Sequence, residues 1–393
     1  MSADGETASP ILKPAVRVHA RIAEVGRAVW DDCAANGGGP FMRFDFLDAC
    51  EEAGCAVERT GWGPRHLSVE DESGRIAAVM PLYLKAHSQG EYVFDHAWAQ
   101  AYEQAGGRYY PKLLCAAPFT PVAGRRMLVR PDVDPDQAEA LLLGGALTLC
   151  EQTGASSLHV NFPTEAEWRA FGRTGLLQRQ DLQYMWENDG YASFDDFLAA
   201  LSSSRRKTIR RERRDANAGI EIVAVTGDDI TEDHWDAFFA FYLDTGSRKW
   251  GRPYLNRLFF ALIGERMKHD IVLILARRDG EWIAGALNFS DGQTLYGRQW
   301  GALEHIPFLH FELCYYRAID WAIAHGLQRV EAGAQGEHKL ARGYLPKPVY
   351  SAHYIADKAL RDPVARYLAQ ERPAVERDIE MLEAEYSPFK RDS

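Results

Sequence analysis

Cysteine is scarce in this sequence, and its placement excludes the usual metal and disulfide patterns. The six cysteines form no C-x-x-C pair and have no histidine at the spacing of a zinc ligand. They are spread along the chain at Cys33, Cys50, Cys55, Cys115, Cys150 and Cys314. We therefore expect reduced cysteines with structural roles, and no metal site.

Long apolar runs are missing as well. The longest, ALLLGGALTL, falls well short of the roughly 20 residues that a membrane-spanning helix needs. The first ten residues, MSADGETASP, are polar and acidic and lack the apolar core of a signal peptide. We expect a cytoplasmic protein without a membrane span.

Three catalytic fingerprints are also missing. The sequence contains no G-x-S-x-G nucleophile elbow, no Walker loop and no G-x-G-x-x-G dinucleotide-binding motif. These absences argue against a hydrolase, a nucleoside triphosphatase and a dehydrogenase.

What the sequence does contain is an internal repeat. Residues 70–98, EDESGRIAAVMPLYLKAHSQGEYVFDHAW, recur as residues 276–301, ARRDGEWIAGALNFSDGQTLYGRQWG. Each copy predicts strand, glycine turn, strand, turn, strand, and is followed by a helix and a further strand. The 393 residues suffice for two cores of about 150 residues each. We expect an α+β fold of two tandem domains, each a mixed, mainly antiparallel sheet covered by helices.

The two copies differ in length. The turn glycines lie 206 residues apart, whereas the helix-ending glycines Gly154 and Gly326 lie 172 apart, so the first half holds 34 extra residues. This insertion, AYEQAGGRYYPKLLCAAPFTPVAGRR, either lines a substrate pocket or merely covers a sheet edge. The residues that would line the pocket are Tyr102, Tyr109, Tyr110, Lys112, Phe119, Arg125 and Arg126.

Positive charge is concentrated in one segment. The chain carries a net charge of −11, yet residues 205–214 hold seven basic residues and one acidic residue, which leaves −17 for the remainder. Ser193 as N-cap and Gly219 as stop predict one helix over residues 194–218, with its cations on the outer face. This face is either solvated and paired with nearby acids, or a phosphate clamp for coenzyme A or RNA. The clamp would use Arg205, Arg206 and Arg210.

These features predict three segments. Residues 1–38 form a partly disordered N-terminal segment, and residues 39–190 form the first domain with the aromatic insertion. Residues 191–393 form the second domain, which contains the basic helix and ends in a C-terminal helix.

Several of these stretches together carry a family resemblance. They are the repeat, FDHAWAQAYEQAGGRYYPKL, PFTPVAGRR, GSRKWGRPYL, HFELCYYRAIDWA and GAQGEHKLARGY. The chain resembles the Fem-related (FemAB-like) predicted N-acyltransferases, a bacterial group long described as a domain of unknown function, over residues 40–390. Its members resemble tandem GNAT (Gcn5-related N-acetyltransferase) folds, so the resemblance implies two GNAT-like domains and acyl transfer to an amine.

The resemblance leaves the acyl donor open. Better-known Fem relatives use aminoacyl-tRNA to extend peptidoglycan precursors, whereas single-domain GNAT enzymes use acyl-CoA. The GNAT pyrophosphate loop, Q/R-x-x-G-x-G/A, is missing, because residues 298–303 end in Leu and residues 104–109 also fail the pattern. The helical-hairpin arm of some Fem ligases has no counterpart either. We expect no bound cofactor, acyl-CoA or aminoacyl-tRNA as co-substrate, and a tRNA contact through the basic helix.

The candidate catalytic loop follows the strand at residues 329–332. In GNAT-like folds this strand end opens onto the reaction cleft, and Fem-like relatives carry a Lys at the position of Lys339. Amide formation needs a base for the amine and a donor for the oxyanion. The candidate bases are Glu331, Glu337 and His338, and the candidate substrate-binding residues are Gln335, Gly336, Lys339 and Arg342. His310, which opens the preceding helix, is a weaker candidate for binding the donor phosphate.

Three functions follow from these features. The first is an N-acyltransferase that transfers an acyl or aminoacyl group to an amine, such as that of a peptidoglycan-type precursor. The alternatives are an acyl-CoA-dependent acetyltransferase of a small amine and a non-catalytic module that binds a precursor or RNA. The catalytic loop has no equivalent in the first half, so we assign chemistry to the second half and acceptor recognition to the first.

Overall fold

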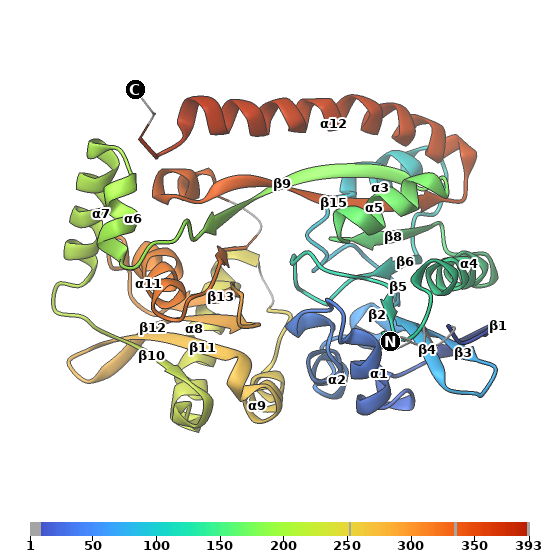
Figure 1. Cartoon of the computed structure of the whole chain (residues 1–393), viewed down its shortest axis with the longest axis horizontal. Helices are drawn as coiled ribbons and strands as arrows, with labels where there is room; N and C mark the ends of the chain where they lie inside the picture. Colours follow the sequence, from blue (N-terminus) through green and yellow to red (C-terminus); the bar gives the residue numbers. More distant parts are fainter. Residues whose placement is uncertain (1–8, 251–252, 334–335, 391–393) are drawn as a thin grey trace, which may run out of the picture. The chain divides into compact units, whose positions relative to one another are not determined.

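Two compact units make up the chain. The computed structural model describes residues 9–250, 253–333 and 336–390 (Figure 1). Unit 1 comprises Met1–Arg179 and Tyr350–Ala369, and unit 2 comprises Gln180–Val349 and Gln370–Ser393. This division differs from the predicted boundaries, because β1 and α1 of the predicted N-terminal segment belong to unit 1, and so does a stretch near the C-terminus.

Unit 1 contains two sheets. One is antiparallel with the order β1-β3-β4-β7, and the other has the order β15-β8-β6-β5-β2, in which β6 and β8 run parallel. The strands are β1 (Leu12–His19), β2 (Trp62–Pro64), β3 (His66–Asp71), β4 (Ile76–Met80), β5 (Tyr83–Lys85), β6 (Lys112–Cys115), β7 (Leu128–Val129), β8 (Ser157–Asn161) and, from Tyr350 on, β15 (Leu345–Ile355). The helices are α1 (Arg27–Ala34), α2 (Phe44–Glu52), α3 (His96–Gln104), α4 (Pro135–Thr153), α5 (Glu165–Arg173) and the first part of α12 (Lys358–Tyr386).

The first copy of the repeat departs from the predicted meander. Its first two strands, β3 and β4, pair as expected around a turn at Gly74, whose φ of 86° suits glycine. The predicted third strand is wrong: residues 86–95 form a loop, and the following residues form helix α3. The apolar letters YVF favour a strand locally, but the acidic residues beside them are buried against lysines elsewhere in unit 1.

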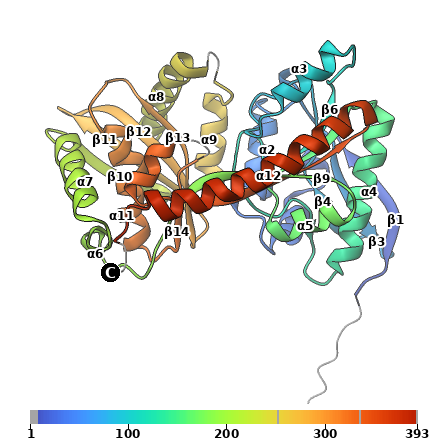
Figure 2. The ribbon, with the colours of Figure 1, turned by 90° about the horizontal axis from the view of Figure 1, so that it is seen from above.

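Unit 2 contains the sheet order β10-β11-β12-β13-β14-β9. The strands are β9 (Leu177–Glu187), β10 (Glu221–Thr226), β11 (Ile271–Arg278), β12 (Glu281–Ser290), β13 (Thr294–Ala302) and β14 (Arg329–Glu331). Helices α8 (Glu232–Trp250) and α9 (Arg257–Arg266) cover one face of this sheet (Figure 2). The opposite face carries α6 (Phe194–Ala200), α7 (Ser203–Ala216), and a continuous helix made of α10 (Leu309–Phe311), a π-helical turn (Glu312–Tyr316) and α11 (Arg317–Ala324).

The second copy of the repeat is the predicted meander. Strands β11, β12 and β13 pair antiparallel in sequence order, and the first turn has left-handed backbone at Asp279 (φ 52°) and Gly280 (φ 88°). Such a two-residue turn matches the twist of the strands it joins. The expected α+β fold, with mainly antiparallel sheets covered by helices, is therefore confirmed.

The predicted basic helix over residues 194–218 is corrected to two helices, α6 and α7. Ser193 caps α6 as expected, accepting a hydrogen bond from the Asp196 amide at 3.1 Å. The chain then becomes extended at Leu201 and Ser202 (ψ 158° and 152°), and Leu201 forms a β-bridge with Phe389. Burial of Leu201 (0% exposed) in the core of unit 2 outweighs the continuous helical pattern.

Among the helices of the described chain, none combines the length and apolar composition that a membrane crossing requires.

Candidate functional site

The candidate site in unit 2 begins where two parallel strands part. Strands β13 and β14 are paired over three positions only, from Thr294 with Arg329 to Tyr296 with Glu331. Strand β13 continues to Ala302, whereas the chain after Glu331 turns away. Beside this point the register of β12 and β13 shifts, a bulge of the kind often found next to active sites. The parting leaves backbone of β13 without a partner from β14.

A pocket of about 120 Å³ lies at this parting. It is lined by residues 286–288 of β12, residues 297–300 of β13, Ala332, and residues of the helix that starts at residue 309, including Cys314 and Tyr315. A second pocket of about 480 Å³ shares Trp300 and His310 with the first. The two pockets are therefore neighbours on either side of Trp300 and His310.

Glu331 is the last paired residue of β14 and is only 6% exposed. Its Oε2 is buried without a hydrogen-bond partner among the described residues. Burial raises the pKa of Glu331 to about 7, although Arg329 and Arg298 act in the opposite direction. A carboxyl group whose pKa lies near neutrality can take a proton from an amine and release it again.

Lys339 lies in the loop that follows β14 and is 2% exposed. Its Nζ donates to the carbonyl oxygen of Gly333 at 2.7 Å. Burial lowers the pKa of Lys339 to about 8, with Cys314 raising it and Arg298 lowering it further. Arg298 and Cys314 both line the smaller pocket, whereas Lys339 is not among its lining residues.

The other predicted residues of this loop are more exposed. Glu337 and His338 are exposed, and His338 Nε2 is 2.9 Å from the Tyr315 hydroxyl. Gly336 has a φ of 118° and lies against the ring of His338, so its role is conformational. Gln335 lies outside the described residues. Burial raises the pKa of Tyr315 above its usual value, which keeps its hydroxyl a proton donor at the pocket wall.

Arg342 does not present its guanidinium group to the pocket, contrary to its predicted role in substrate binding. It donates to both carboxylate oxygens of Glu212 on α7, at 2.8 and 2.9 Å, and to the carbonyl oxygen of His338 at 2.7 Å. Glu212 also accepts a hydrogen bond from Tyr316. Arg342 and Glu212 therefore fix the catalytic loop to α7 from behind.

Removing Glu212 tests this structural role. We expect Glu212→Ala to lower the free energy of unfolding by about 3–5 kcal/mol, because it leaves the buried Arg342 without a counter-charge. Urea unfolding followed by circular dichroism measures the change. The control is Asp195→Ala, which breaks an exposed pair with Arg210 and should cost less than about 1 kcal/mol. A loss for Glu212→Ala no larger than that of the control would contradict the role.

His310 lines both pockets and packs edge-on against Trp300 at 5.2 Å. Glu312, two residues after His310 in the same helix, is 0% exposed. Arg213 and Arg317 pair with Glu312 at 3.1 and 2.9 Å. The helix start therefore carries no uncompensated negative charge from Glu312.

The predicted phosphate-binding arginines differ in exposure. Arg205 and Arg210 are exposed on α7, and Arg210 is 3.2 Å from Asp195. Arg206 is half-buried and donates to the carbonyl oxygen of Leu201 at 3.2 Å. A phosphate contact of these residues stays a prediction.

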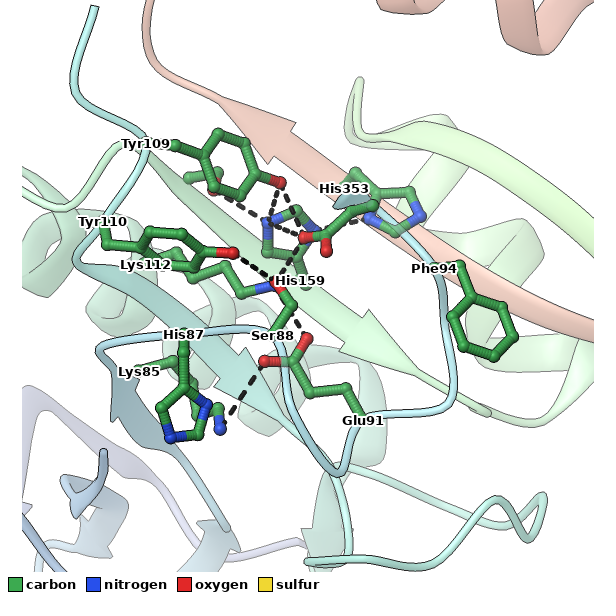
Figure 3. Close-up of polar contacts among 12 residues, drawn as sticks. Lys85, His87, Ser88, Glu91, Phe94, Tyr109, Tyr110, Lys112, His159 and His353 are labelled. Carbon is green, nitrogen blue, oxygen red and sulfur yellow. Dashed lines mark hydrogen bonds and ion pairs between the residues drawn. The ribbon is translucent and has the colours of Figure 1, made fainter. Parts of the chain in front are cut away.

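The predicted substrate residues of unit 1 lie in a buried polar network (Figure 3). Lys112 is 0% exposed and pairs with Glu91 at 2.7 Å and with Asp95, so its ammonium group does not reach the surface. Tyr109 is also 0% exposed and donates to Asp95 at 2.7 Å. Tyr110 is half-buried, with its hydroxyl 2.9 Å from the Ser88 hydroxyl. The insertion thus supplies part of a closed network rather than the wall of an open pocket.

The same network contains two histidines. His159 and His353 face each other on paired strands β8 and β15, with their Nδ1 atoms 2.7 Å apart. Burial lowers the pKa of His159 to about 3, so both rings are neutral at physiological pH. Each ring also contacts a serine hydroxyl on its own strand, which holds the pair in place.

Sequence reasoning missed four residues that the structure makes central. They are Tyr315 at the pocket wall, Glu212 behind the catalytic loop, and Lys85 and Glu91 in the network of unit 1. One signal was present: PLYLK and PKLLC each place a lysine at the end of an apolar strand. Both lysines are buried in the structure, and buried lysines require partners.

Three solved structures are similar to this chain. The crystal structure of FemX superposes with a TM-score of 0.52 and 13% identity, covering 89% of this chain and 100% of FemX. L-PGS from Bacillus licheniformis gives a TM-score of 0.48 at 10% identity, covering 81% of this chain and 95% of L-PGS. A tandem GNAT protein from the clavulanic acid biosynthesis pathway gives 0.46 at 12% identity, covering 87% of this chain and 98% of the other.

No curated protein matches the sequence. The likeness to FemX shows a shared fold. The sequence itself matches the model of the FemAB-like family, described as peptidoglycan biosynthesis/recognition, over residues 21–391. The chain belongs to the FemAB-like family.

Proposed function

We propose that the protein is an N-acyltransferase that transfers an acyl or aminoacyl group to the amine of a peptidoglycan-type precursor. The observation that supports this most is the parting of β13 and β14, where a pocket is lined by Ala332, the residue after the buried Glu331, and where the following loop carries the buried Lys339. Backbone freed from pairing can bind an extended donor by hydrogen bonds, as an added strand would. The family description, peptidoglycan biosynthesis/recognition, supports the class of acceptor.

In the proposed reaction, the acceptor amine attacks the carbonyl carbon of the donor ester or thioester. A C–N bond forms, the bond from carbon to the leaving oxygen or sulfur breaks, and the amine proton passes to Glu331. Lys339 stabilises the negative charge that develops on the carbonyl oxygen. Tyr315, which lines the pocket, donates a proton to the leaving group and regains one from solvent through His338.

The first test identifies the acyl donor. Purified protein is mixed with a UDP-linked peptidoglycan precursor and either aminoacyl-tRNA or acetyl-CoA, and amide formation is followed by mass spectrometry. The larger pocket is mainly apolar, and its described lining contains no Lys or Arg to bind a pyrophosphate. We therefore expect product with aminoacyl-tRNA and less than a tenth of that rate with acetyl-CoA. A folded protein that forms no amide with either donor would refute the proposed function.

The pH dependence of kcat/KM is a second prediction. Glu331 must be deprotonated to act as base, so activity should fall tenfold per pH unit below about 7. Lys339 must be protonated to stabilise the oxyanion, so activity should fall above about 8. We expect a narrow bell-shaped profile between these limits, measured in buffers of constant ionic strength. Activity that rises steadily to pH 10 would exclude a protonated Lys339 from the reaction.

A further inference from the structure

Unit 1 buries two lysines side by side. Lys85 ends β5 and Lys112 begins β6, and the two are direct partners in the antiparallel register. Both side chains are 0% exposed. Like charges placed opposite each other repel, and taking each ammonium group out of water costs several kcal/mol. Nothing in the proposed transfer reaction requires this arrangement.

The groups that compensate these lysines come from one loop, residues 86–95. Lys112 Nζ lies 2.7 Å from Glu91, 2.8 Å from the Ser88 hydroxyl, and within hydrogen-bond distance of Asp95. Lys85 Nζ lies 3.6 Å from Glu91 and 3.3 Å from the carbonyl oxygen of Gln89. Figure 3 shows this loop passing over the ends of both strands. The acidic groups of the loop therefore occupy the positions around the two ammonium groups.

The carboxylates of the loop are imperfect counter-ions. Glu91 Oε1 and Asp95 Oδ1 are buried without a hydrogen-bond partner among the described residues. Burial raises the pKa of Glu91, and burial lowers the pKa of Lys85 to about 7. Each group thus lies in surroundings that weaken its charge. An anion with more oxygen atoms would satisfy both lysines better.

The loop gains little from apolar packing of its own. Phe94 is 50% exposed, and Tyr92 and Val93 are only half-buried. The backbone is left-handed at Gly90 (φ 78°) and at Tyr92 (φ 59°), a conformation that a tyrosine seldom adopts. Its position depends on polar contacts. Besides the contacts with the lysines, Tyr109 donates to Asp95, Arg179 donates to the carbonyl oxygen of Phe94, and His87 contacts the carbonyl oxygen of Thr60. A competing anion can therefore displace Glu91 from the lysines while these contacts hold the two ends of the loop.

We propose that Lys85 and Lys112 form a binding site for a phosphoryl group, and that the loop of residues 86–95 covers this site with its own carboxylates until the ligand replaces Glu91. Two ammonium groups match the charge of a phosphate dianion. The Tyr110 hydroxyl, now 2.9 Å from Ser88, lies beside the site to donate a further hydrogen bond. The site is independent of the proposed transferase reaction, and binding alone tests it.

The probe is inorganic phosphate at pH 7, where Lys85 is still partly protonated and much of the phosphate is a dianion, titrated by isothermal calorimetry at constant ionic strength. We expect weak binding to the wild type and at least tenfold tighter binding to Glu91→Gln, which removes the competing charge but keeps the shape. The double variant Lys85→Met/Glu91→Gln should lose that gain. Lys13→Met, which removes a half-exposed lysine paired with Glu70 in the same unit, should bind like the wild type.

Three results would overturn the proposal. One is an affinity of Glu91→Gln equal to that of the wild type, and another is a double variant that binds as tightly as Glu91→Gln. The third is tighter binding of succinate than of phosphate, which would assign the site to dicarboxylates. If the variants fail to fold, hydrogen exchange of the wild type decides: phosphate, and not chloride at equal ionic strength, should speed exchange in residues 86–95, and no change refutes the site.

Discussion

Replacing Glu331 with Gln is expected to lower kcat/KM for amide formation by 10²- to 10⁴-fold, the range typical of a general base. Gln keeps the size of the side chain but cannot accept the amine proton. The carboxyl group is buried, has one oxygen without a hydrogen-bond partner among the residues that the structure describes, and has its pKa raised to about 7 by that burial. The measurement is a single-turnover rate with the donor established by the assay above.

Two variants make this result specific. Glu187→Gln, on the neighbouring strand β9 and half-exposed, should retain activity within threefold because Glu187 pairs with Lys347 at the surface. Glu337→Gln tests the alternative base of the same loop. If Glu337→Gln loses activity and Glu331→Gln does not, the base is Glu337 and the assignment to Glu331 is wrong.

Glu331→Gln should also change stability in a pH-dependent way. The folded pKa of Glu331 exceeds the unfolded value of about 4.5, so the folded state holds the proton more tightly. Stability of the wild type should therefore fall as pH rises from about 4.5 to 7, by on the order of 3 kcal/mol from this group. Gln does not titrate, so the variant should be as stable as the wild type at pH 4.5 and more stable at pH 8. Urea unfolding at both pH values measures the difference. A variant less stable than the wild type at pH 8 would contradict the raised pKa of the buried Glu331.

The features that depend on local pattern could be predicted from the sequence. The meander β11–β13 follows from alternating apolar residues and from a Gly turn, and both signals lie within 32 consecutive residues. The strand end at Glu331 and the glycine-rich loop after it are likewise local features. Together with the family resemblance they led to Glu331, as one of three candidate bases, and to Lys339, whose burial and shifted pKa values then depend on the surrounding fold.

The features that depend on distant partners could not be predicted. Arg342 is charged, lies in the catalytic loop and was expected to bind substrate, but its partner Glu212 is 130 residues away in the sequence. Glu212 is the one acidic residue within residues 205–214, and no local pattern indicates that it pairs with Arg342. In unit 1, the letters GEYVFDH predict a strand because nothing local shows that their acidic groups belong to Lys112.

Replacing Lys339 with Met is expected to lower kcat by 10²- to 10³-fold with KM changed less than threefold, as for loss of one oxyanion-stabilising group. Met retains the length and apolar stem of Lys but cannot donate to the developing oxyanion. A purely structural role, through the bond from Nζ to Gly333, would lower stability and leave the pH profile unchanged. We expect instead that the alkaline limb near pH 8 disappears in Lys339→Met, because the group that titrates there is gone. Lys347→Met, which removes a surface lysine of the same unit, should keep both limbs. A Lys339→Met enzyme with full kcat, or with its alkaline limb intact, would remove Lys339 from the reaction.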